Sequence, residues 1–223
     1  MKGASFAFWI CLIVIINQCA AWTDDHTYIT DEEDLSYVTY GSMLKLRHVS
    51  TEYRLHSHEV SYGSGSKQQS VTAVAQGDDL NSFWVLKSPH GIDLPQGTPL
   101  KHGDKFRLQH IRTGRNLHSH NFPAPLSSGF EVSCFGENGN GDESDNWVLD
   151  IPSKEGYWRR GQSVRIKHDV QGYYLASHDV SFGRPIAGQH EVKGVTKKRD
   201  YQCLWKTEEG IYYERIIDEE QDE

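Results

Sequence analysis

The sequence predicts an all-β protein in which one unit is used three times. Three times a glycine is followed seven residues later by a histidine and, ten residues after that, by a second histidine. A tryptophan closes each set 26 or 27 residues further on. Self-similarity at a fixed period is the sequence signature of a repeat architecture. The residues of this repeat signature are Gly41, His48, His58 and Trp84, then Gly103, His110, His120 and Trp147, and finally Gly161, His168, His178 and Trp205.

The residues around these positions indicate short strands. Leu44–His48, Phe106–His110 and Val164–His168 alternate apolar and polar side chains, as half-buried strands do. No amphipathic helix of ten or more residues is visible. Three copies of a roughly four-strand unit that close on one another bury their apolar faces and remove exposed sheet edges. We therefore predict a β-trefoil with pseudo-threefold symmetry and repeats at about 36–90, 91–151 and 152–213.

The beginning of the chain has the pattern of a secretory signal peptide. Lys2 precedes the apolar run Phe6–Ile16, and small residues follow at Cys19–Ala21. We expect cleavage between Ala21 and Trp22. The apolar run is shorter than the roughly 20 residues that a membrane span needs, so no span is expected. Residues 22–35 are predicted to be an acidic, flexible lead-in, and residues 214–223 an acidic tail.

The charge balance narrows the classes of partner. The formal net charge is −8 at pH 7. Proteins that bind nucleic acid or polyanionic glycosaminoglycans present a basic surface, which this composition does not favour. We expect no nucleic-acid partner.

Removal of a signal peptide would leave two cysteines, Cys134 and Cys203. In an oxidising compartment an even pair favours a disulfide. Sequence alone does not show that the two sulfur atoms meet, so a pair of buried free thiols stays open as the alternative.

Two segments suggest a metal site at first. His56–His58 and His118–His120 each place two imidazoles on one face of a strand, at a spacing that zinc or copper accepts. The third unit has Ala176 in place of the first histidine, and no carboxylate or thiolate stands at a ligand spacing nearby. Because the second histidine recurs in every unit, we expect it to be structural, with a ring nitrogen satisfying a turn carbonyl, and we expect no metal.

Several aromatic residues and one acidic segment also suggest ligand binding. The periodic tryptophans could stack on sugars, but periodic aromatic residues in a symmetrical β fold favour a core role. Tyr62, Tyr173 and Phe182 remain candidates for exposed sugar-binding rings. The acidic, glycine-rich stretch Gly136–Asp145 does not have the residue order of a calcium-binding loop, so we expect a solvated loop there.

The sequence carries no recognisable catalytic motif. It has no Gly-x-Ser-x-Gly, no phosphate-binding glycine loop and no zinc-protease helix. Ser57 and His58 are adjacent on an expected strand and point to opposite faces, so they cannot share a proton. We expect no enzymatic activity and no cofactor.

Several motifs together resemble the MIR repeat family. These are the Leu-His-Ser-His sequence at 117–120, the segments 131–136 and 188–192, and the stretch from Trp205 to Tyr212. Because a signal peptide precedes them and no other domain is attached, the chain is similar to the stromal cell-derived factor 2 family, over about residues 33–213.

The resemblance implies a non-catalytic β-trefoil in the lumen of the endoplasmic reticulum. Members are implicated in quality control, as subunits with a J-domain co-chaperone and, through it, with the lumenal heat-shock chaperone and misfolded clients. They are also linked to protein O-mannosylation. The ending Glu220–Glu223 lacks the retention tetrapeptide of some members, so retention by a partner, or partial secretion, is expected. The alternatives are a module that binds O-mannosyl glycans and a protease inhibitor that uses the Phe122–Pro125 stretch.

Overall fold

The structure is a computed structural model, and it describes residues 34–216. The expected cleavage site at Ala21 and Trp22, most of the lead-in and residues 217–223 of the tail lie outside the described residues. The only helices in the described part are short. Four are single 3-10 turns, η1 (Asp34–Ser36), η2 (Leu80–Ser82), η3 (Glu137–Gly139) and η4 (Glu143–Asp145), and one is α-helical, α1 (Asp200–Cys203).

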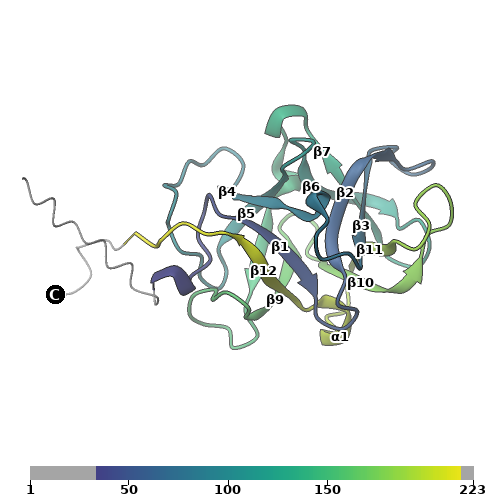
Figure 1. The fold of residues 1–223 in the computed structure, drawn as a ribbon. Coiled ribbons are helices and arrows are strands. Elements are labelled where there is room, and N and C mark those ends of the chain that lie inside the picture. The colour runs from purple at the N-terminus through teal and green to yellow at the C-terminus, as the bar shows by residue number, and fades with distance from the viewer. Residues whose placement is uncertain (1–33, 217–223) are drawn as a thin grey trace, which may run out of the picture.

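Twelve strands fall into three sets of four within residues 34–216 (Figure 1). The first set is β1 (Met43–His48), β2 (Arg54–Ser61), β3 (Gln69–Val74) and β4 (Trp84–Lys87). The second is β5 (Lys105–His110), β6 (Asn116–Pro123), β7 (Phe130–Phe135) and β8 (Trp147–Asp150). The third is β9 (Ser163–His168), β10 (Tyr174–Ser181), β11 (His190–Val195) and β12 (Trp205–Ile211).

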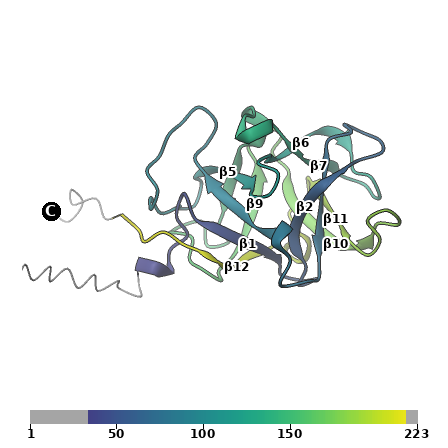
Figure 2. The ribbon, with the colours of Figure 1, turned by 45° about the horizontal axis from the view of Figure 1, so that its top comes forward.

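The strands build a closed barrel with a cap of hairpins. The barrel strands pair in the ring β1, β4, β5, β8, β9, β12 and back to β1. The second and third strands of each set form the hairpins β2–β3, β6–β7 and β10–β11. These hairpins meet through pairings of β3, β7 and β11 with one another, and Figure 2 shows them gathered on one side of the barrel. This is the architecture of a β-trefoil, so the predicted fold is confirmed.

The pseudo-threefold axis is marked by a triangle of backbone hydrogen bonds at the barrel end away from the hairpins. Val38 N–H donates to Trp158 O, Trp158 N–H to Leu100 O, and Leu100 N–H to Val38 O, over 2.8–3.1 Å. Each of these residues stands three positions before a glycine of the repeat signature. Gly41, Gly103 and Gly161 all have positive φ, a conformation that glycine adopts without steric cost. They turn the chain from this triangle into the barrel.

The three signature tryptophans fill the core. Trp84, Trp147 and Trp205 are fully buried. Each indole N–H donates to a backbone carbonyl of the hairpin in its own repeat, namely Leu55 O, Leu117 O and Leu175 O, at 3.0 Å in every case. Because a buried indole costs free energy unless its N–H finds an acceptor, these bonds let each ring occupy the core.

Each tryptophan meets the first signature histidine of the next repeat. Trp84 lies opposite His110 in the strand register, Trp147 opposite His168, and Trp205 opposite His48. The paired rings are in contact, with centroids 4.9–5.0 Å apart. We call each such pair an indole–imidazole brace. One brace stands at each of the three junctions between repeats.

The histidine of each brace also binds the chain just before the tryptophan. The Nε2 atoms of His48, His110 and His168 donate to the carbonyls of Gln202, Asn81 and Ser144, over 2.8–2.9 Å. Each carbonyl lies three residues before its tryptophan. The expectation that the second signature histidine satisfies such a carbonyl is therefore wrong. The first histidine does so, because its strand register carries it to the neighbouring repeat.

The hairpin connections are held by buried carboxylates. Glu131 on β7 accepts hydrogen bonds from the backbone N–H and the hydroxyl of Ser66, in the β2–β3 connection. Glu191 on β11 accepts from Leu126 N–H and the hydroxyl of Ser127, in the β6–β7 connection. Both carboxylates are almost completely buried. We call these two arrangements carboxylate clamps. Each one ties a hairpin to its neighbour.

The disulfide that the sequence favoured does not form. Cys134 and Cys203 are both free and buried, which is the alternative that the sequence left open. Cys134 lies on β7 beside Ser57 and Gln69, whereas Cys203 ends α1 and lies among residues of the third repeat. Burial raises the pKa of Cys134 to about 12 and raises that of Cys203 as well. Both groups therefore stay protonated and unreactive near neutral pH.

The braces make stability depend on pH. Burial lowers the pKa of His48 and of His110 to about 4, and it lowers that of His168. The unfolded chain binds these protons at about pH 6.5, so stability present above that pH is lost as the pH falls from 6.5 to 4. For His48 and for His110 the loss approaches about 3 kcal/mol each when complete. Urea unfolding at a series of pH values measures it, and a free energy of unfolding that stays constant down to pH 4.5 would contradict it.

The clamps predict a local effect on a hairpin connection. Glu131→Gln keeps the shape of the side chain but weakens its charge-assisted bonds, so we expect a loss of about 1–3 kcal/mol. Amide hydrogen exchange should become faster in residues 62–68 and remain unchanged in residues 182–189. The exposed Glu59→Gln is the matched control. Uniform acceleration in both connections would show that Glu131 supports the whole fold and not its own clamp.

Candidate functional site

The chemistry-bearing side chains outside the braces gather on the hairpins. On β2, His56 and His58 face the same side, as the sequence predicts, and their rings lie 4.9 Å apart at centroid. His56 Nδ1 is 2.7 Å from Asp79 Oδ2, and His56 Nε2 is 3.0 Å from His58 Nδ1. The three side chains form one hydrogen-bonded chain from Asp79 through His56 to His58.

The second repeat has the same histidines in a different network. His118 Nδ1 is 2.9 Å from Oδ1 of Asp145, a fully buried carboxylate. His120 Nε2 bonds the clamp residue Glu131 at 3.1 Å. In the third repeat Ala176 replaces the first histidine, and His178 Nε2 bonds the other clamp residue, Glu191, at 2.7 Å.

Sequence reasoning missed the carboxylates that pair with these histidines. Asp79 contacts His56, and Asp145 contacts His118, although neither stands near its partner in the chain. A signal was present for the first of them. An aspartate stands five residues before every signature tryptophan, at Asp79, Asp142 and Asp200. Asp79 and Asp142 are the N-cap residues of the short helices η2 and η4.

One group of side chains has the composition of a metal site. His118, Asp142 and Asp145 offer ligand atoms within 4.8 Å of one another. The buried carboxylate is already fully engaged, because Asp145 Oδ2 accepts from Asn116 Nδ2 and Asp142 N–H while its Oδ1 bonds His118. Asp142 Oδ1 accepts from Ser144 N–H at 2.8 Å. This is the geometry of a helix capping box, which accounts for these residues without a cation.

The acidic stretch Gly136–Asp145 is only partly the solvated loop that the sequence predicts. It folds into η3 and η4, and its last carboxylate, Asp145, points inward and is fully buried. The stretch therefore supports the hairpin β6–β7 through His118.

The prediction that three aromatic rings are exposed and available to sugars is wrong. Tyr62 and Tyr173 are buried, and Phe182 is half-buried. The Tyr62 hydroxyl shares its proton between the carbonyls of Val71 and Val132, on the hairpins β2–β3 and β6–β7. The exposed rings on the hairpins are instead Phe122, at 45% exposed, and Phe135, at 37%.

Phe135 borders a pocket between the first two hairpins. The pocket has a volume of about 510 Å³ and is lined by Phe135, Gln68, Arg115, Glu137 and Asn140, together with three small residues. An aromatic ring beside amide, guanidinium and carboxylate groups suits a neutral polar ligand such as a sugar.

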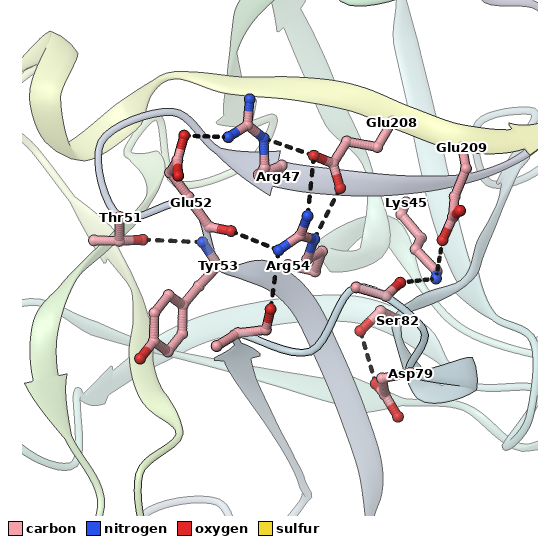
Figure 3. A network of polar contacts seen from close by, with 12 residues as sticks. Lys45, Arg47, Thr51, Glu52, Tyr53, Arg54, Asp79, Ser82, Glu208 and Glu209 are labelled. Atoms are coloured by element: carbon pink, nitrogen blue, oxygen red, sulfur yellow. Dashed lines mark hydrogen bonds and ion pairs between the residues drawn. The ribbon is translucent and has the colours of Figure 1, made fainter.

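The charged groups along the seam between the first and last strands pair with one another. Arg47 on β1 lies 2.6 Å from Glu52 and 2.7 Å from Glu208 on β12, and Arg54 on β2 lies 2.8 Å from Glu208 (Figure 3). The fully buried Lys45 contacts Glu209. The pairs made by Glu208 and Glu209 join the last strand to the first repeat and support the β1–β12 pairing that closes the barrel. Each of these charged side chains has a partner of opposite charge.

No helix within residues 34–216 is both long enough and apolar enough to cross a bilayer.

Comparison with known proteins identifies the family. The profile of the MIR domain matches residues 55–156. The stromal cell-derived factor 2-like protein of Dictyostelium discoideum is 47% identical over 213 residues, which are 93% of this chain and 98% of that protein.

The similar solved structures include the following two. The crystal structure of the SDF2-like protein from Arabidopsis thaliana has a TM-score of 0.77 and 44% identity, and the match covers 80% of this chain and 98% of that one. The protein O-mannosyltransferase complex of S. cerevisiae, bound to the sugar donor, has a TM-score of 0.70 and 31% identity, with 83% of this chain matching 27% of that one. The repeats, the trefoil and these relatives agree: the chain belongs to the stromal cell-derived factor 2 family of MIR-domain proteins.

Proposed function

We propose that this protein is a non-catalytic subunit of the quality-control machinery in the lumen of the endoplasmic reticulum. It binds a J-domain co-chaperone and, through it, the lumenal heat-shock chaperone, and together they keep misfolded clients soluble. Family membership supports this proposal. So does the signal-peptide pattern at the start of the sequence.

The strongest structural support for the proposal is a set of three exposed apolar side chains on the hairpins. Val60, Phe122 and Val180 are exposed by 36%, 45% and 39%, and each stands two residues after the second signature histidine. They therefore occupy equivalent places on β2, β6 and β10, at the outer ends of the three hairpins. We call them the apolar triad. Because the three hairpins gather on one side of the barrel, these side chains are candidates for the apolar anchors of a protein-binding surface. Phe122 also lies within β6, so the stretch Phe122–Pro125 does not have the form of a separate inhibitory loop.

A second candidate function is glycan binding at the Phe135 pocket. The similarity to a mannosyltransferase complex bound to its sugar donor favours it. The lining of aromatic, amide and charged side chains has the chemistry of sugar recognition.

The apolar triad predicts the result of a co-purification. Replacing all three residues by serine should reduce recovery of a J-domain protein from native microsomes at least about tenfold, because interface apolar residues carry much of the binding energy. Ile92→Ser, at a residue 53% exposed and far from the hairpins in sequence, is the matched control. Recovery of no J-domain protein by the unchanged chain would overturn the proposal.

The glycan alternative makes a separate prediction. Mannosyl peptides on an array should bind the unchanged protein and lose most of their signal with Phe135→Ala, since the ring supplies the stacking surface. Phe122→Ala should leave the signal unchanged. If no mannosyl peptide on the array binds the protein at high protein concentration, the glycan alternative is contradicted. That result would leave the co-chaperone proposal unaffected.

A further inference from the structure

The cap of the trefoil has three equivalent corners, where a hairpin meets the connection of a neighbouring hairpin. Two of them are the carboxylate clamps. In each clamp a buried glutamate accepts from a serine hydroxyl of the connection and from Nε2 of the second signature histidine. Glu131 pairs in this way with Ser66 and His120, and Glu191 with Ser127 and His178.

The third corner lacks both halves of the clamp. The register places Ser70 of β3 where the other hairpins have Glu131 and Glu191, because Val71, Val132 and Val192 pair with equivalent serines. Ser70 turns its hydroxyl to Val60 O at 2.7 Å, within its own hairpin. Ser66 and Ser127 each lie three residues before the strand that follows their connection, β3 or β7. The residue at the same position before β11 is Ala187.

The histidine of this corner is left with an unsatisfied atom. His58 Nε2 is buried and has no hydrogen-bond partner, whereas His120 and His178 bond their glutamates through the same atom. A buried polar atom without a partner costs about 1–3 kcal/mol. An unpaired buried atom of this kind points to a ligand that supplies the missing bond.

The polarity of that atom follows from the chain of hydrogen bonds behind it. A carboxylate only accepts, so Asp79 receives the proton of His56 Nδ1, and His56 Nε2 is then an acceptor. His58 Nδ1 must donate to it, which leaves Nε2 of a neutral His58 as an acceptor as well. Burial lowers the pKa of both histidines and keeps them neutral at pH 7. The open corner therefore requires a donor and disfavours a carboxylate, in agreement with serine at position 70.

We propose that this corner binds a serine or threonine side chain of another polypeptide, whose hydroxyl donates a hydrogen bond to Nε2 of His58. The incoming hydroxyl oxygen takes the place of the carboxylate oxygen that His120 and His178 bond in the two clamps. A peptide is favoured over other hydroxyl donors because a serine of a polypeptide connection lies at both clamped corners, whereas Ala187 stands at that place in the third. The site lies at a different corner from the Phe135 pocket and uses no residue of the apolar triad.

Access to the corner is through the connection that no clamp ties. Residues 182–189 form the longest of the three hairpin connections. Arg184, Pro185, Ala187 and Gly188 are exposed. A bond of 2.6 Å from Thr72 Oγ1 to Gln189 Oε1 holds the connection at its base. Burial of Ile186 anchors the middle of the connection, and no clamp ties the exposed residues on either side of it.

The test is a titration of the full mature chain, labelled with nitrogen-15 in histidine. The probes are acetyl-Ala-Ser-Ala-amide, the alanine peptide acetyl-Ala-Ala-Ala-amide and the glutamate peptide acetyl-Ala-Glu-Ala-amide. The serine peptide should shift the His58 Nε2 resonance and saturate it, leaving the rings of His120 and His178 unchanged. It should bind about tenfold more tightly than the alanine peptide, the effect of one net hydrogen bond.

Two variants locate the response. Ser70→Glu places a side chain in the corner and should abolish the response, with the unchanged resonances of His120 and His178 as the check that the variant is folded. Ser66→Ala, in another corner, should leave the response unchanged. Equal or absent binding of the serine and alanine peptides would overturn the proposal. So would tighter binding of the glutamate peptide, an equal response to methyl α-mannoside, or a full response in Ser70→Glu.

Discussion

The contact on which the rest of this structure depends is the indole–imidazole brace. It occurs once at each junction between repeats and joins two chain segments that belong to different repeats. The imidazole contacts the indole, bonds the carbonyl three residues before it, and takes the neutral form because it is buried. The indole in turn bonds the hairpin of its own repeat. One barrel junction and one hairpin are thus fixed by the same pair of rings.

This arrangement explains where the three repeats are alike and where they differ. The residues of the braces are identical in type at all three junctions, since a change at one would leave a buried polar atom unpaired. The hairpins only have to pack on the brace through a backbone carbonyl, so their outward side chains are free to vary. The second signature histidine shows this variation. His120 and His178 each bond a clamp glutamate, whereas His58 bonds His56, which in turn bonds Asp79.

Much of the fold could be predicted from the sequence because three copies of one pattern can be compared with one another. The spacing of glycine, histidine and tryptophan predicted the symmetry, and the alternation around these residues predicted the strands and hence the trefoil. What the sequence could not reveal were contacts between repeats. The carbonyl partner of His48, the carboxylate behind His118 and the burial of Tyr62 all depend on side chains brought together by closure of the barrel. Cys134 and Cys203 illustrate the same limit, because an even number of cysteines does not place two sulfur atoms close together.

A double-mutant cycle between Trp147 and His168 tests the central role of the brace most directly. Trp147→Phe, His168→Gln and the double variant are compared by urea unfolding at pH 7.5. If the two rings act as one unit, the double variant loses less stability than the sum of the single variants, with a coupling of roughly 1 kcal/mol or more. The same cycle between Trp147 and His48, which belong to different junctions, should be additive. Additive losses for Trp147 and His168 would contradict the account.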